Sequence, residues 1–284
     1  MIISEKGVLA AIRELLPHFV VAGRLACRVQ DDLIKNGAQN NDSKAGDQFT
    51  EALTDADIII ETYLGTIFLT TFEDAAFYGE EYERDRVSNY FPKEAPYLLT
   101  LDPIDGTLYF KDGLPFFSTI LTICTQNRIV GALIYLPRKK RFYLATESDG
   151  AFTTTAEDVT LHAPLLPYSA ITRDKFINID PDNDLTIEPN LKKAGFDIIH
   201  QRRDYDRSPT WFRTNLGLFT GEFAGSIVVD AQVIDIAAMA FIVDKAGGKM
   251  NGTHFNPETK RIDRLVLGTA PDIFEALMKI AGTV

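Results

Sequence analysis

The feature that most restricts the fold of this chain is an acidic turn that directly follows a short apolar run. Residues 97–101 are typical of a strand, and they lead into Leu101, Asp102, Pro103, Ile104, Asp105, Gly106 and Thr107. Pro103 fixes one φ angle and Gly106 permits close backbone approach, so both carboxylates and the Ile104 carbonyl can converge on a hard cation. The same residue types also form solvated turns. This segment alone leaves both interpretations open.

Three further acidic positions share this ambiguity. Glu80 and Glu81 follow an aromatic, strand-like segment and a glycine, which suits a carboxylate at a sheet edge, although adjacent acids are commonly a solvated charge pair. Asp235 opens an apolar helix that ends in two glycines, and Asp57 lies in the first turn of an earlier predicted helix. Both aspartates also suit a structural cap at a helix N-terminus.

Apolar periodicity divides the chain into helices and strands in mixed order. Helices are predicted over residues 8–35, from Thr54 onward, and over residues 210–220, 235–246 and 271–280. Closely connected β-rich runs predict an antiparallel meander over residues 116–125, 129–136 and 141–146, with later strands near 226–229 and 265–268. We expect an exposed loop over residues 37–47 and assign no element to residues 155–206. The pattern indicates packed α and β layers, in two halves that share one site.

Charge and composition narrow the function classes. The chain is 45% hydrophobic and 24% charged, as expected of a globular protein, and its formal net charge of −11 disfavours nucleic acid polymers and anionic membranes as partners. No apolar run reaches membrane-spanning length and residues 1–6 have no secretory pattern, so a cytoplasmic location is expected. An anionic substrate would need local cations to reverse the sign of the site.

In their order along the chain, these segments resemble the inositol monophosphatase family of metal-dependent sugar and nucleotide phosphatases. The family pattern places Gly-Glu-Glu before an Asp-Pro-Ile-Asp-Gly-Thr turn, followed much later by Trp-Asp-x-Ala-Ala and a helix that ends in Ala-Gly-Gly. The matching positions here are residues 79–81, residues 101–107, Asp235 with Ala237 and Ala238, and residues 246–248. Thr54 with Asp57, residues 113–116 and residues 131–137 also match.

The resemblance implies roles for individual residues. Glu80, Asp102, Asp105, Asp235 and the Ile104 carbonyl would bind a cluster of two or three Mg²⁺ ions. Glu80 and Thr107 would orient a water and help to deprotonate it, and Asp57 would support Thr107 through a hydrogen bond. The residues in contact with the substrate phosphate would be Asp105, Gly106, Thr107 and Asp235.

The resemblance also implies an architecture. The fold class would be α+β, a layered α-β-α-β-α sandwich of the sugar phosphatase type, with the meander sheet in the first half and a smaller mixed sheet in the second. Residues 1–284 would form one unit, in which residues 1–152 are the metal and catalytic half, and residues 153–284 supply Asp235 and substrate contacts. A homodimer and inhibition by Li⁺ are further expectations from the family.

The expected activity is Mg²⁺-dependent hydrolysis of a small soluble phosphate monoester, such as inositol monophosphate or a related sugar or polyol phosphate. The substrate stays open because Val228 replaces a hydroxyl-binding Glu of inositol-specific members, and Ile234 replaces the family Trp. The alternatives are 3′(2′),5′-bisphosphate nucleotidase or fructose-1,6-bisphosphatase activity, for which Arg202, Arg203, Arg207 and Arg213 are candidate contacts to a second phosphate. A phosphatase-like regulatory or binding protein is the non-enzyme alternative, although converging carboxylates without a metal would repel one another.

Overall fold

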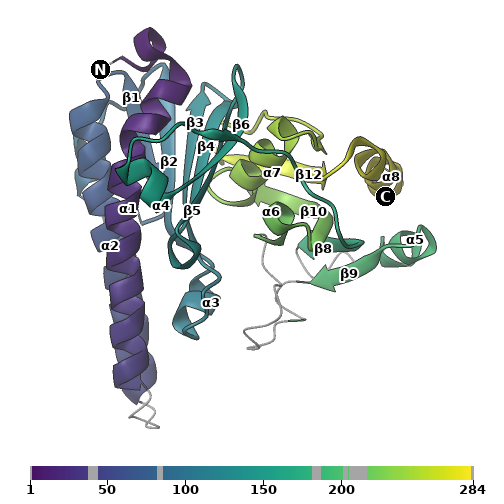
Figure 1. The fold of residues 1–284 in the computed structure, drawn as a ribbon, viewed down its shortest axis with the longest axis horizontal. Helices are drawn as coiled ribbons and strands as arrows, with labels where there is room; N and C mark the ends of the chain where they lie inside the picture. Colours follow the sequence, from purple (N-terminus) through teal and green to yellow (C-terminus); the bar gives the residue numbers. More distant parts are fainter. Residues whose placement is uncertain are drawn as a thin grey trace.

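The computed structural model describes residues 2–37, 44–81, 86–180, 187–200, 204 and 216–282. Within these residues the chain forms two β-sheets, with helices on both outer faces and one helix between the sheets (Figure 1). The layers run helix, sheet, helix, sheet, helix, so the predicted α+β sandwich is confirmed. In the described part of the chain, no helix is both long enough and apolar enough to cross a membrane.

Two long helices form the first layer, α1 (Ile3–Gly37) and α2 (Lys44–Thr71). They lie side by side against one face of the first sheet (Figure 1). Buried side chains such as Phe19 of α1 and Phe68 of α2 pack in one apolar cluster with residues of that sheet. The first helix ends at Gly37, where the sequence predicts its stop.

The predicted start of the second helix is wrong. The sequence analysis places it at Thr54, whereas α2 already begins at Lys44, so residues 44–47 do not belong to the predicted loop. Residues 38–43 lie outside the described part. Residues 44–53 contain no proline and a single glycine, so nothing in the backbone interrupts the helix before Thr54. Asp57 therefore lies inside a long helix, and a capping role no longer explains it.

The first sheet contains its strands in chain order from β1 to β7. They are β1 (Ala75–Gly79), β2 (Tyr97–Asp105), β3 (Ser118–Thr125), β4 (Arg128–Leu136), β5 (Arg141–Thr146), β6 (Gly150–Thr155) and β7 (Leu166–Pro167). From β2 onward each pair is antiparallel, so the predicted meander is confirmed. β1 is parallel to β2, with Gly79 opposite Leu101. The residues that follow Gly79 and Leu101 are thereby brought together at one edge of the sheet.

The second sheet has the strand order β11-β12-β10-β8-β9. Its strands are β8 (Phe176–Asp180), β9 (Asp197–His200), β10 (Phe223–Gln232), β11 (Lys249–Met250) and β12 (Arg261–Gly268). Helix α7 (Ile236–Lys245) lies between the two sheets and contacts β4 and β5 on one side and β10, β11 and β12 on the other. Its residues 236–243 are all buried, which explains why its sequence is apolar all round. The outer face of this sheet packs against α8 (Pro271–Ala281).

The region without predicted elements, residues 155–206, contains several short ones in its described part. Besides β7, β8 and β9 they are α4 (Ala156–Thr160) and α5 (Glu188–Lys193). Each has at most six residues, too few for apolar periodicity to be visible in the sequence. Of the predicted helix over residues 210–220, residues 210–215 lie outside the described part, and Gly217–Thr220 forms the short helix α6.

Candidate functional site

Glu80 and Asp102 lie side by side because β1 and β2 are parallel. The Glu80 amide donates to the Leu101 carbonyl at 3.0 Å, and the carboxyl groups of Glu80 and Asp102 are hydrogen-bonded to each other. Asp102 is 5% exposed, and its Oδ1 has no hydrogen-bond partner among the described residues. Burial and then the charge of Glu80 raise the pKa of Asp102 well above its ordinary value.

The acidic turn contains a β-bulge. Asp102 lies opposite Ile120 and Asp105 lies opposite Ser118, so the register with β3 shifts between the two aspartates. The Ser118 hydroxyl donates to Asp105 at 2.8 Å. Burial outweighs this hydrogen bond and raises the pKa of Asp105 to about 6. The bulge therefore directs a second, half-buried carboxylate toward the same region as Glu80.

Gly106 and Thr107 complete the turn and begin the short helix α3 (Thr107–Lys111). Gly106 has a φ of +87°, and a Cβ atom there would lie 2.8 Å from the Phe116 carbonyl oxygen, so both conformation and space require glycine. Thr107 is exposed, and its hydroxyl donates to the Ile104 carbonyl at 3.3 Å. That carbonyl, the expected ligand oxygen, is thus turned toward Thr107, while the Ile104 side chain is buried in the core.

Asp235 approaches this cluster from the second half of the chain. It is the N-cap of α7, where its Oδ1 accepts a hydrogen bond from the Ile236 amide at 2.7 Å. Burial and then the charge of Asp105 raise the pKa of Asp235 to about 7. The capping role and membership of the acidic cluster are therefore compatible, because one carboxylate oxygen caps the helix and the other is left for the site.

Helix α2 contributes Asp57. Asp57 is 6% exposed, and its Oδ1 has no hydrogen-bond partner in the described part of the chain. Burial and then the charges of Glu80, Glu81 and Glu61 raise its pKa to about 8. No hydrogen bond between Asp57 and Thr107 is present among the described contacts, since the Thr107 hydroxyl donates to Ile104 instead.

Glu61 is a member of the cluster that the sequence analysis missed. It is 0% exposed, and its Oε2 accepts a hydrogen bond from the Glu81 amide at 3.0 Å. A Cβ atom at Gly79 would lie 2.1 Å from the Glu61 carboxyl carbon, so the glycine lets the strand end pass directly over this carboxylate. The available signal was its spacing, because Glu61 is four residues from Asp57 and the two share one helix face.

The donor set fits a hard divalent cation in its chemistry. The acids of the cluster whose pKa is raised are Asp57, Glu80, Asp102, Asp105 and Asp235. Buried oxygens of Asp57 and Asp102 have no partner among the described residues, which a cation would supply. As the side chains stand in the described part, no group of three or more His, Cys, Asp or Glu residues is spaced to hold a metal ion.

The residues at the positions expected to contact the substrate are less polar than the acids of the cluster. Val228 is 4% exposed and packs in the core between the sheets. Asp230, two residues on, has a φ of +59° and pairs with Arg261 at 2.7 Å. Arg202, Arg203, Arg207 and Arg213 lie outside the described residues. Neither described residue therefore replaces the hydroxyl-binding Glu of the family pattern.

The chain is similar to known proteins both in sequence and in fold. The model of the inositol monophosphatase family matches residues 14–283. The inositol monophosphatase of Dictyostelium discoideum is 29% identical over 237 residues, 81% of this chain and 82% of its own. A fructose-1,6-bisphosphatase of Pyrococcus furiosus is 36% identical over 59 residues, 21% of this chain and 23% of its own. The crystal structure of the extragenic suppressor protein suhB from Bartonella henselae has a TM-score of 0.60 at 19% identity and covers 91% of this chain and 96% of its own, which shows a shared fold.

Proposed function

The chain belongs to the inositol monophosphatase family, whose members are phosphoric monoester hydrolases, and we propose that it is a Mg²⁺-dependent phosphatase of a small soluble phosphate ester. The observation that supports this most is the meeting of acids from α2, α7 and the ends of β1 and β2 at one place, where burial and then their mutual charges raise their pKa. Without a cation, the mutual repulsion of these carboxylates lowers the stability of the folded protein, and a divalent ion would relieve that repulsion.

The proposed metal ligands are the side chains of Glu80, Asp102, Asp105 and Asp235 together with the Ile104 carbonyl. Bound Mg²⁺, as two or three ions, would neutralise substrate charge, lower the pKa of the attacking water and stabilise the leaving oxygen. Because little covalent chemistry is left to the protein, its contribution would be positioning and electrostatic stabilisation.

The remaining residues would handle the water and the phosphate. Glu80, at the end of β1, would accept the proton of the attacking water, with the Thr107 hydroxyl holding that water in place. The amides of Gly106 and Thr107 would face the phosphate, since they begin α3 and have no carbonyl partner within that helix. The support of Thr107 by Asp57 would require the Thr107 hydroxyl to leave the Ile104 carbonyl, to which it donates in the structure.

The proposed substrate class is a sugar or polyol phosphate, and inositol monophosphate is one member of it. The buried Val228 disfavours the recognition of a substrate hydroxyl at that position, because Val228 has no side-chain hydrogen-bonding group. Fructose-1,6-bisphosphate is the second candidate, supported by the similarity of 59 residues to the Pyrococcus furiosus enzyme.

A phosphate-release panel tests the proposal. The purified chain with Mg²⁺ would be incubated with inositol monophosphate, fructose-1,6-bisphosphate and related sugar, polyol and nucleotide phosphates. We expect release from at least one of them, abolished by EDTA and reduced by Li⁺. Absence of release from every substrate, in a preparation that binds Mg²⁺, would show that the proposal is wrong.

A further inference from the structure

One cavity of the described residues shares no lining residue with the acidic cluster. It has a volume of about 800 Å³ and lies between the second half of α1, the 3₁₀ helix η2 (Pro137–Lys139) and α4. None of the proposed metal ligands lines it. The cavity is thus a separate feature of the fold that the proposed phosphatase reaction does not use.

The aromatic side chain that lines the cavity is packed within the protein. Tyr135 stacks on Phe142 with ring centroids 4.1 Å apart and an interplanar angle of 17°. Gly23 of α1 faces this ring, and a Cβ atom at that position would lie 2.3 Å from a ring carbon of Tyr135. Both faces of the Tyr135 ring are therefore covered, and Tyr135 is 2% exposed, while Pro137 is also buried. Leu161 is 68% exposed, so an apolar part of a ligand could lie against its side chain.

The rim of the cavity is cationic, although the whole chain is acidic. Two cations of the lining are already paired, Arg138 with Asp31 at 2.6 Å and Lys35 with Asp32 at 3.9 Å. Arg24, Arg28 and Lys140 are exposed and have no ion-pair partner among the described residues. Glu157 is the one acid of the lining outside the two pairs. Three unpaired cations against one acid give a local positive field in a chain of net charge −11.

We propose that this cavity is a second ligand site, for a small molecule that carries a phosphate-like anionic group beside an apolar body. The anion would be bound by Arg24, Arg28 and Lys140, and the apolar body would contact Leu161. Arginine suits this role because its planar guanidinium group offers paired donors to phosphate oxygens.

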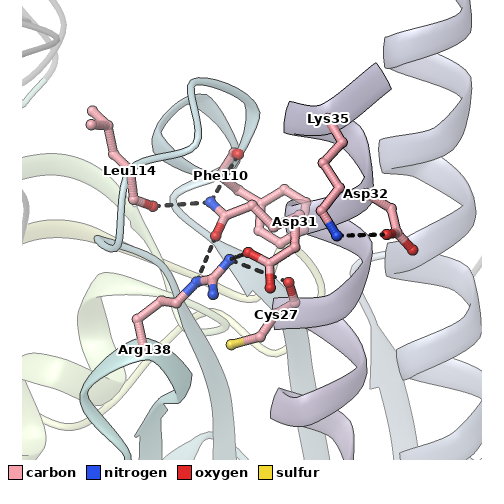
Figure 2. Close-up of polar contacts among 8 residues, drawn as sticks. Cys27, Asp31, Asp32, Lys35, Phe110, Leu114 and Arg138 are labelled. Carbon is pink, nitrogen blue, oxygen red and sulfur yellow. Dashed lines mark hydrogen bonds and ion pairs between the residues drawn. The ribbon is translucent and has the colours of Figure 1, made fainter. Parts of the chain in front are cut away.

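The structure also connects this cavity to the acidic turn. Arg138 donates to Gln30 at 2.8 Å and to the Cys27 carbonyl at 3.2 Å, in addition to Asp31. Gln30 is 1% exposed, and its amide donates to the carbonyls of Phe110 and Leu114 at 3.0 Å each. Figure 2 shows Arg138 among Asp31, Cys27 and the chain at Phe110 and Leu114.

The connection gives the second site a regulatory role, which rests on the proposed function. Phe110 lies in α3, the helix that begins at Thr107 directly after the acidic turn. A bound anion that attracts Arg138 would weaken its pairing with Asp31 and alter its bond to Gln30, and Gln30 holds the C-terminal end of α3. The expected consequence is a change in the rate of phosphate release when the cavity is filled.

The binding test uses 8-anilinonaphthalene-1-sulfonate, an aromatic anion, with the whole chain in EDTA, where the phosphatase site cannot bind anions through metal. We expect saturable fluorescence binding that becomes about tenfold weaker in the Arg24→Ala, Arg28→Ala double variant. The Lys93→Ala, Lys279→Ala double variant removes the same charge from exposed positions outside the cavity and should bind as wild type. Equal affinity in all three proteins, or no saturable binding, would overturn the proposed site whether or not the chain is a phosphatase.

Cys27 localises the bound probe. Cys27 lines the cavity and is half-buried, whereas the other cysteine, Cys124, is fully buried. Burial raises the pKa of the Cys27 thiol, so its alkylation by iodoacetamide should be slow and is best followed above pH 8. Saturating probe should slow this alkylation further in wild type. Alkylation at an unchanged rate would mean that the probe binds elsewhere and would overturn the proposal.

The coupling is tested on the active enzyme. We expect saturating probe to change kcat/KM for phosphate release by about fivefold in wild type and to have no effect in Gln30→Met, in which Cys27 should still be protected from alkylation. Protection of Cys27 without any change in kcat/KM of wild type would overturn the regulatory role. Removal of the Gln30 amide leaves the Phe110 and Leu114 carbonyls without their donor, which could destabilise the protein. Thermal unfolding of Gln30→Met therefore checks that the variant is folded.

Discussion

At the scale of single residues, the acidic cluster contains five carboxyl groups whose pKa is raised. Asp102 and Asp235 come from different halves of the chain and are coupled through their charges. Their repulsion is the physical reason to expect a bound cation, because burial of unpaired carboxylates is otherwise destabilising.

Asparagine at either position should separate metal binding from folding. Asp102→Asn and Asp235→Asn remove a charge that burial and the neighbouring acids disfavour in the metal-free protein, and asparagine can still cap α7, so the melting temperature in EDTA should not fall. Turnover should fall on the order of 100-fold or more, since a ligand and transition-state electrostatics are lost. Asp263→Asn, at an exposed position outside the cluster, is the matched control for kinetics and unfolding. Wild-type turnover in either cluster variant would mean that the ligand assignment is wrong.

Glu61 has a role that the structure alone reveals, as the anchor of the segment that carries Glu80. Its Oε2 accepts the Glu81 amide, so Glu61→Ala should loosen this segment and weaken Mg²⁺ affinity by about 10- to 100-fold, as is usual for groups that orient metal ligands. Glu61→Gln retains an oxygen acceptor and should restore most of that affinity. The measurement is Mg²⁺ binding by calorimetry without substrate, together with the Mg²⁺ dependence of kcat. Equal affinity in Glu61→Ala and wild type would contradict a positioning role.

At the scale of elements, the acidic turn depends on how β2 ends. The β-bulge between Asp102 and Asp105 and the left-handed conformation of Gly106 let the chain leave the sheet and start α3 within two residues. The predicted meander and the helices after Asp235 are confirmed because each has a long enough apolar pattern. The short elements α5, β8 and β9 are stabilised by tertiary packing, which local sequence does not record.

Alanine at Gly106 should destabilise the protein more than alanine at Gly150, although both glycines have a φ of +87°. Nothing lies within 4 Å of a Cβ at Gly150, so that variant should lose about 1–2 kcal/mol from backbone strain alone. At Gly106 the added methyl group also meets the Phe116 carbonyl oxygen at 2.8 Å and must displace the turn. Chemical unfolding measures both losses. Equal losses in the free energy of unfolding would show that the turn accommodates the methyl group at residue 106 without additional destabilisation.

At the scale of the whole molecule, the two sheets are joined through α7, whose buried residues belong to the same core as β4, β10 and β12. We therefore expect the two halves to unfold together. The division at residue 152 and the homodimer stay predictions, as does a cytoplasmic location. Light scattering of the purified chain measures the oligomeric state directly.

The electrostatics of the cluster predict how stability depends on pH. The raised pKa values, about 6 for Asp105, about 7 for Asp235 and about 8 for Asp57, mean that the folded protein holds protons which the unfolded chain has already lost. The free energy of unfolding of the metal-free protein should therefore fall as pH rises from about 4 to 8. Saturating Mg²⁺ binds the ionised carboxylates and should remove this fall, so its stabilisation should be larger at pH 8 than at pH 6.

Thermal unfolding in EDTA and in Mg²⁺ across this pH range checks the prediction. Ca²⁺ serves as the control for a purely structural site, which would stabilise the protein without turnover. Metal-free stability that rises between pH 6 and 8 would contradict the proposed cluster, because the sign of the linkage would then be reversed.

The sequence by itself determined the order and chemistry of the acids, the acidic turn, the meander and the apolar central helix. These features depend on local residue types and periodicity, so they can be predicted without knowledge of the fold. Only the tertiary structure placed Glu61 beneath Gly79, required glycine at Gly106, and joined Arg138 to Gln30 across 108 residues of sequence. Such contacts depend on the parallel pairing of β1 with β2 and on the packing of α1 against the sheet. Packing between residues far apart in the sequence produces no periodic pattern from which it could be predicted.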